Sequence, residues 1–254
     1  NKRLTRHSLA LAAAGLLCSV GSAHAATTWT PNFNTCSHGS KVSNAGSYSS
    51  WDPCGSGTTS DVRVGAVATS GSTLISAAVY SWGSNGLGVV NTDENVNSTG
   101  PHAIDSYGGI DALALNFQSS VSLSGFTIGW NGTDNAYYGY NDSDVGIYAW
   151  TGGGTGPSSY NKSVSGWSLI GTYMDVGTGS NYQSVSTSTY SSYWLISALG
   201  NSDGQIDAFK LLSVAGVTAT TPPFNGVPEP GSLALLGLGA AGLLAARRKS
   251  LARR

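Results

Sequence analysis

Two closely spaced carboxylates are the strongest candidate metal ligands in this sequence. Asp142 and Asp144 stand two residues apart, with Gly146 shortly after them. Alternate acidic residues on a bent loop can converge on Ca²⁺, which binds oxygen ligands. Asp111 and Asp207 could join them from other loops or strand starts. The rest of an EF-hand loop is missing, so a solvated Asx turn is the alternative. Apart from this candidate structural Ca²⁺, the sequence predicts no cofactor.

Aromatic side chains near this segment form a second candidate site. Tyr137, Tyr138 and Tyr140 stand in a stretch rich in Gly, Asn and Asp, and Trp150 and Trp167 stand in the runs that flank it. Exposed aromatic rings can stack on the apolar faces of sugars, so this group is consistent with glycan binding. Burial in the core is the alternative for the two tryptophans.

Motifs typical of catalysis occur in contexts that do not suit them. Residues 200–204 match the G-x-S-x-G pattern of hydrolases, which needs a strand, a turn and then a helix. The residues that follow alternate like a strand, so we predict a β-turn. His38 and His102 are the only histidines between residues 26 and 226, and neither has a signature partner. The carboxylates are too scattered for a glycosidase pair. The sequence therefore predicts no catalytic residue and no enzyme activity.

Short strands, not helices, must position these residues. Runs rich in Val, Ile, Thr and aromatic residues recur between clusters of Gly, Ser and Asn, and no 3.6-residue period is sustained. Alternation places Leu113 and Leu115 on one face and Ala112 and Ala114 on the other. The pattern predicts one all-β domain, an antiparallel β-sandwich with a jelly-roll-like topology. The predicted strands are Val62–Ala68, Thr73–Trp82, Leu87–Asn91, Ile110–Phe117, Val121–Trp130, Val145–Trp150, Trp167–Met174, Tyr193–Leu199 and Ile206–Val214.

The predicted body is strongly acidic. Residues 26–226 contain four Lys or Arg and twelve Asp or Glu, which leaves −8, whereas the whole chain carries −1. Nucleic acid and anionic membranes would repel such a surface, so we expect neither as a partner. Divalent cations and neutral polysaccharide are compatible with it.

Cysteine usage fits an exported protein. Cys18 lies in a segment that we expect to be removed, which leaves Cys36 and Cys54. One pair in an oxidising compartment predicts a disulfide. A zinc site with His38 is the alternative, but it lacks a fourth ligand.

The first 25 residues have the three parts of a secretory signal peptide. A basic start precedes an apolar run, Leu9–Val20, and the small residues Ala23 and Ala25 place the cleavage before Ala26. We therefore expect the Sec translocon and signal peptidase as partners.

A rigid motif separates the body from an apolar tail. Residues 220–226 are a predicted linker between the body at 26–219 and a tail at 227–254. The tail begins with Val227, Pro228, Glu229 and Pro230. The two prolines fix φ and remove backbone donors, so this segment should be extended and solvated. Such a segment suits a processing enzyme that needs bare backbone.

The rest of the tail has the composition of a short membrane anchor. Leu233–Ala246 contains fourteen uncharged residues. As a helix it would be about 21 Å long, shorter than the ~30 Å hydrocarbon core, and it can span where the membrane thins. Arg247, Arg248 and Lys249 follow, and the positive-inside rule predicts that they stay in the cytoplasm.

This tripartite tail resembles the PEP-CTERM sorting signal of Gram-negative bacteria. Pro228-Glu229-Pro230, the Leu233–Ala246 run and the Arg247-Arg248-Lys249 stop carry the resemblance. It implies recognition by exosortase, an integral-membrane cysteine transpeptidase-like enzyme that removes the anchor. An ordinary tail anchor that is never cut is the alternative. Four body segments also resemble those of small exosortase-dependent surface proteins: Gly109–Leu113, Phe126–Gly132, Ser192–Ala198 and Gly204–Leu211.

Together these features predict a non-enzymatic protein of the cell surface or extracellular matrix. It would cross the inner membrane, be held there transiently by one helix, and be released by exosortase. The alternative is a secreted carbohydrate-binding module with the same sorting, whose partner would be extracellular polysaccharide.

Overall fold

Strands make up nearly all the regular structure in the computed structural model of the protein. The residues it describes are 28–29, 32–33, 35–53, 62–91, 102–132, 140–153, 156–157, 165–178, 181–200 and 203–219. The only helical element among them is the 3₁₀ turn η1 (Gly83–Asn85). The strands are β1 (Thr28–Trp29), β2 (Ser40–Ser43), β3 (Val62–Ser70), β4 (Thr73–Ser81), β5 (Leu87–Val90), β6 (Ile104–Asp105), β7 (Asp111–Asn131), β8 (Tyr140–Asp142), β9 (Val145–Trp150), β10 (Trp167–Tyr173), β11 (Gln183–Ser184), β12 (Ser191–Ala198) and β13 (Ile206–Thr218).

The all-β prediction is confirmed, and each of the nine predicted strands overlaps an observed one. The bounds of β9 agree at both ends, and β3 and β13 run beyond the predicted Ala68 and Val214. The five strands that the sequence did not predict have two to four residues each: β1, β2, β6, β8 and β11. Such segments are too short to display a two-residue period.

The long strand β7 passes through both halves of the sheet. Its first half pairs with β3 and β12, and its second half pairs with β11 and β13. Between the halves, Gln118 and Ser119 are exposed, and pairing continues across them at Val121, which faces both Ser191 and Thr218. The polar residues that separated two predicted strands therefore mark a bend within one strand.

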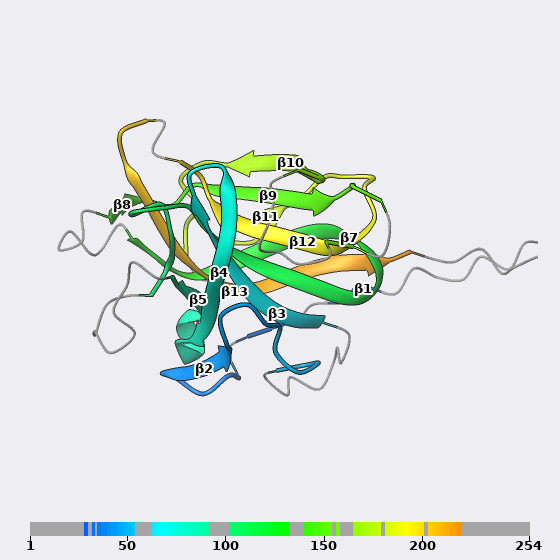
Figure 1. Ribbon diagram of the computed structural model, residues 1–254, viewed down its shortest axis with the longest axis horizontal. Coiled ribbons are helices and arrows are strands. Elements are labelled where there is room, and N and C mark those ends of the chain that lie inside the picture. The colour runs from blue at the N-terminus through cyan, green and yellow to red at the C-terminus, as the bar shows by residue number, and fades with distance from the viewer. Residues whose placement is uncertain are drawn as a thin grey trace, which may run out of the picture. The chain divides into compact units, whose positions relative to one another are not determined.

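Because β7 is continuous, the described strands form one sheet and not the two separate sheets of the predicted sandwich. The order is β1-β13-β5-β4-β3-β7-β12-β9-β10, and Figure 1 shows β12, β9 and β10 side by side. The additional β13–β7 pairing closes a ring of strands, β13-β5-β4-β3-β7. Strands inside such a ring have no free edge. The named pairings are antiparallel except for β8 with β13, which is parallel.

One hydrophobic cluster fills the interior between the two halves of the folded sheet. It includes Leu113 and Leu115 from the first half of β7, Phe126 and Ile128 from the second, and the fully buried Trp194. Ala112 and Ala114 point the other way and pack with Leu195 in a smaller cluster. The predicted alternation in this strand is confirmed, and both of its faces are buried.

The targeting segments fall outside the structure's description. No helix among the described residues is long and apolar enough to cross a membrane. The predicted run Leu233–Ala246 and the predicted signal peptide at 1–25 lie outside those residues. The membrane anchor therefore stays a prediction.

Candidate functional site

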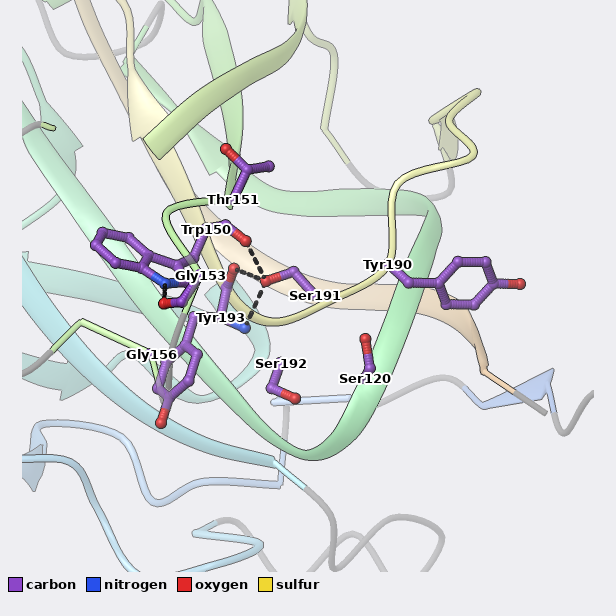
Figure 2. A pocket seen from close by; sticks show the side chains of 9 residues that line it. All are labelled: Ser120, Trp150, Thr151, Gly153, Gly156, Tyr190, Ser191, Ser192 and Tyr193. Carbon is purple, nitrogen blue, oxygen red and sulfur yellow. Dashed lines mark hydrogen bonds between the residues drawn. The ribbon is translucent and has the colours of Figure 1, made fainter. Parts of the chain in front are cut away.

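An aromatic cavity lies where β9, β12 and the bend of β7 meet. Its volume is about 470 Å³, and it is lined by Ser120 of β7, Trp150 of β9 and Tyr190, Ser192 and Tyr193 at the start of β12, among others (Figure 2). Trp150 also packs edge-on against Trp167, with ring centroids 5.5 Å apart. Both tryptophans are half-buried, so neither is a full core residue.

The sequence pointed to different tyrosines for this role. Tyr137 and Tyr138 and the side chain of Tyr140 lie outside the description. Tyr190 and Tyr193 were not predicted as candidates, because they stand in a Ser- and Thr-rich stretch that carries no binding signature. Their close spacing around the start of a predicted strand was the available signal.

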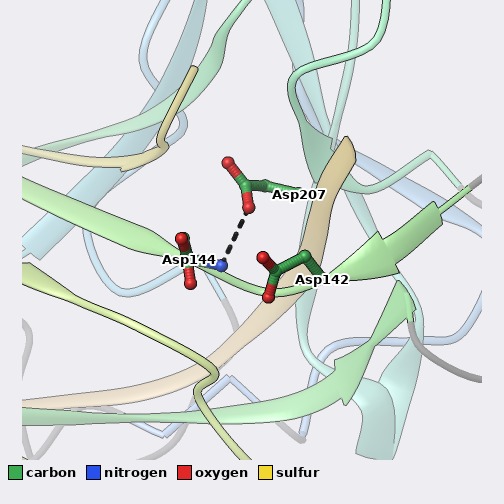
Figure 3. A group of neighbouring side chains, drawn as sticks. All are labelled: Asp142, Asp144 and Asp207. Carbon is green, nitrogen blue, oxygen red and sulfur yellow. Dashed lines mark hydrogen bonds between the residues drawn. The ribbon is translucent and has the colours of Figure 1, made fainter. Parts of the chain in front are cut away.

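A cluster of three buried carboxylates is the candidate metal centre. Parallel pairing of β8 with β13 sets Asp142 opposite Asp207, and Asp144 lies in the short connection between β8 and β9. One oxygen of each carboxylate lies within 4.8 Å of the others (Figure 3). The exposed fractions of the three side chains are 3%, 4% and 2% in chain order.

Backbone N–H groups hold one oxygen of each carboxylate. Ser143 donates to Oδ1 of Asp142 at 2.7 Å, Asp144 donates to Oδ1 of Asp207 at 3.1 Å, and Asp175 donates to Oδ1 of Asp144 at 2.8 Å. The Oδ2 atoms of Asp144 and Asp207 accept no hydrogen bond from any described residue. These oxygens are the ones available for a cation.

Burial makes the ionised form of this cluster costly. Desolvation and, to a smaller extent, the nearby charges of Asp144, Asp142 and Asp203 together raise the pKa of Asp207 to about 7, against the opposing hydrogen bond from the backbone N–H of Asp144. Desolvation likewise raises the pKa of Asp142 to about 6 and moves that of Asp144 upward. Asp203 behaves oppositely, because the backbone N–H of Gln205 lowers its pKa.

The donor set matches a hard divalent cation. Three carboxylates supply oxygen ligands only, and Ca²⁺ accepts six to eight such ligands in flexible geometry, completed by backbone carbonyls or water. Neither histidine is a ligand candidate: the rings of His38 and His102 both pack against Trp82.

The structure brings together three of the four acidic residues predicted for a metal site, and Asp111 is not among them. Asp111 begins β7, where its Oδ1 accepts a hydrogen bond of 3.0 Å from Nδ2 of Asn91. Its backbone carbonyl accepts another from the hydroxyl of Ser197. Asp111 therefore belongs to a separate buried polar group, and its inclusion in the metal site was wrong.

The remaining predicted site residues are only partly covered. Cys36 is buried in the main hydrophobic cluster. Cys54 lies outside the described residues, so the disulfide stays a prediction. The same holds for cleavage at Ala23, Ala25 and Ala26, and for the tail residues from Val227 to Lys249.

Comparison with known proteins assigns the tail. The family model of the PEP-CTERM protein-sorting motif matches residues 226–249, which contain the Pro228-Glu229-Pro230 motif, the apolar run and the basic stop. No curated protein and no solved structure matches the chain. The motif implies export, sorting to the cell envelope or surface, and exosortase as the processing partner. The chain therefore carries a PEP-CTERM protein-sorting motif in its tail, and this motif supports exosortase-type sorting of a secreted protein.

Proposed function

We propose that this protein is a non-enzymatic component of the cell surface or extracellular matrix, exported through Sec and released by exosortase. The observation that carries the proposal is the sorting motif at residues 226–249, attached to an acidic all-β body. The tail anchors the body only until cleavage near Pro228-Glu229-Pro230. The body is then the product that reaches the surface.

The environment of the hydrolase-like motif supports a non-enzymatic role. The strand β13 begins at Ile206, with one residue between it and the segment 200–204, so the helix that a nucleophile elbow requires does not follow. His102 is buried against Tyr80 and Trp82, and His38 packs on the same Trp82 ring.

Intact mass of the protein from its native host tests the sorting proposal. In a host with working exosortase we expect a species that lacks residues 1–25 and the membrane run, and in a host without it a species that keeps the tail. Changing Pro228, Glu229 and Pro230 to alanine should reproduce the second mass. Changing Pro222 and Pro223, which are linker prolines, to alanine is the matched control and should leave processing intact. A full-length tail in the membrane of a competent host would instead indicate a permanent anchor.

We further propose that the released body holds a structural Ca²⁺ ion between Asp142, Asp144 and Asp207. Three buried like charges repel one another, and none of the three forms an ion pair with a described Lys or Arg. A divalent cation would offset this repulsion and join the β8–β9 connection to β13. Extracellular fluid commonly contains Ca²⁺ at the concentrations that weak extracellular sites require, about 10⁻⁴–10⁻³ M.

A carbohydrate-binding module with the same sorting is the second candidate function. The cavity that combines Trp150, Tyr190 and Tyr193 with serine hydroxyls favours it, because such sites pair aromatic rings with a few placed polar groups. In this case extracellular polysaccharide would be the partner of the exported body.

A further inference from the structure

The aromatic cavity is formed by segments whose relative position is fixed by hydrogen bonds. The hydroxyl oxygen of Ser191 lies 3.0 Å from the carbonyl oxygens of both Trp150 and Tyr193, which share its single proton, and it accepts a hydrogen bond from the N–H of Tyr193 at 3.1 Å. This side chain therefore ties the end of β9 to the start of β12 (Figure 2). The wall that carries Trp150 and Tyr193 therefore belongs to the sheet, and Gly153 and Gly156 from the segment after β9 complete the lining.

The two half-buried rings are held in place by their surroundings. The indole N–H of Trp150 donates to the carbonyl oxygen of Gly153 at 3.2 Å, which fixes the ring and satisfies its polar atom. A Cβ at Gly166 would overlap the ring of Trp150, and a Cβ at Gly156 would overlap the ring of Tyr193. Glycine at these two positions leaves the space that the rings occupy. Preorganised rings lose little conformational entropy when a ligand binds.

Two serine hydroxyls supply free hydrogen-bonding capacity beside the rings. Within the described part of the chain, the Oγ atoms of Ser120 and Ser192 form no hydrogen bond. Figure 2 shows both side chains between the rings of Tyr193 and Tyr190. Each hydroxyl can donate one hydrogen bond and accept two. Tyr190 is 47% exposed at the rim, so its ring is also accessible.

The chemistry of this lining selects an uncharged ligand with one apolar face and many hydroxyls. None of the described residues that line the cavity is charged, and the body as a whole is acidic. An anionic ligand would find no counter-charge there and would be repelled at longer range. A volume of about 470 Å³ falls within the usual range for small-molecule sites, roughly 300–1,000 Å³.

We propose that this cavity binds neutral pyranose units of a polysaccharide, with Trp150 and Tyr193 stacking on the sugar and Ser120 and Ser192 bonding its hydroxyls. This assignment deepens the carbohydrate-binding alternative and rests on export, because only an exported body meets extracellular polysaccharide. Calcium is not part of this site, since Asp142, Asp144 and Asp207 are not among its lining residues.

Calorimetry and tryptophan fluorescence of the full chain test the assignment. The probes are cellohexaose, laminarihexaose and mannohexaose, with glucose as the free-sugar arm and an alginate oligosaccharide as the anionic arm. We expect at least one neutral hexasaccharide to bind more tightly than glucose and alginate. Trp150→Ala and Tyr193→Ala should each weaken that binding roughly tenfold, the worth of one aromatic contact. Tyr193→Phe should retain it.

Matched variants separate loss of the site from loss of the fold. Tyr107→Ala removes a tyrosine that is 57% exposed and does not line the cavity, so it should bind like the unchanged protein. Tyr190→Ala, at the exposed rim, should weaken binding without lowering the melting temperature, even if Trp150→Ala unfolds. The proposal is overturned if no neutral hexasaccharide binds at millimolar concentration, if alginate binds best, or if Tyr107→Ala weakens binding as much as Tyr193→Ala. A sorting failure would appear only in the intact mass from the host, so the two results are independent.

Discussion

The backbone N–H of Asp144 donates a 3.1 Å hydrogen bond to Oδ1 of Asp207, and so joins two buried acidic residues that are 63 positions apart (Figure 3). The bond attaches the β8–β9 connection to the start of β13. It satisfies one oxygen of Asp207 but leaves its charge uncompensated. Because Asp142 and Asp144 converge on the same point, the fold positions three carboxylates before any ion is bound.

Calcium should stabilise the protein through this cluster. At about one hundred times the dissociation constant, a bound ion adds about 2.7 kcal/mol, which corresponds to a rise in melting temperature of about 5–10 °C for a body of this size. Asp207→Asn should abolish the rise, because it removes one charged ligand while its amide oxygen can still accept the bond from Asp144. Differential scanning calorimetry with CaCl₂ and with EDTA measures both.

A charge-matched control accompanies that variant. Asp52 has φ of 47°, a conformation that Asn also tolerates, and it is not part of the carboxylate cluster. Asp52→Asn should therefore keep the full calcium response. Equal melting temperatures in calcium and EDTA for the unchanged protein would remove the metal site.

The stability of the metal-free protein should fall as pH rises from about 4 to about 7. The pKa of Asp207 is raised from 3.8 to about 7, so across this window the folded protein holds a proton that the unfolded chain has released. Asp142, with its pKa raised to about 6, acts in the same direction. Because the ion competes with these protons, the calcium-dependent rise in melting temperature should grow over the same window.

Urea unfolding in EDTA at a series of pH values measures this effect. Asp207→Asn should flatten the decline, since the amide does not titrate. An equal pH dependence in the unchanged protein and in Asp207→Asn between pH 4 and 7 would contradict the raised pKa of Asp207, because groups that titrate in both proteins, such as Asp203 with its lowered pKa, cancel in that comparison.

The strand pattern was predictable because local alternation survives in the folded sheet. Leu113 and Leu115 face the main cluster, while Ala112 and Ala114 face the smaller one, as the two-residue period indicates. The bend at Gln118 and Ser119 was misread, because polar residues in a strand look like a turn when long-range pairing is unknown.

The carboxylate cluster was only partly predictable for a similar reason. The spacing of Asp142 and Asp144 is local, whereas their approach to Asp207 depends on the register between β8 and β13. A sequence contains no direct record of register. Asp111, like Asp207, is a carboxylate at the start of a strand. In the structure its side chain instead accepts a hydrogen bond from Asn91.

The buried Lys210 should contribute to stability through aromatic rings. Its Nζ lies 3.8 Å from the ring centroid of Trp130 and 5.0 Å from that of Trp82, and the residue is only 3% exposed. Lys210→Met keeps much of the volume but loses these cation–π contacts, so urea unfolding should show a loss of about 2 kcal/mol. Lys41 lies 5.7 Å from the ring centroid of Tyr80 and is exposed, so Lys41→Met should cost at most about 0.5 kcal/mol. Equal losses in the two variants would show that burial between the rings is not the cause.

The turn between β4 and β5 should depend on close approach to β13 as well as on backbone conformation. Gly86 has φ of 94°, and a Cβ there would overlap the carbonyl oxygen of Leu211. Gly204 has a similar φ of 90° but nothing within 4 Å of its Cβ position. Gly204→Ala should therefore cost about 1–2 kcal/mol for the left-handed conformation alone. Gly86→Ala should cost about 1–3 kcal/mol more, because β13 must move to admit the methyl group. Chemical denaturation of the two variants side by side measures the difference. Equal denaturation midpoints would mean that β5 and β13 do not lie as close in solution as their single pairing at Leu87 and Leu211 requires.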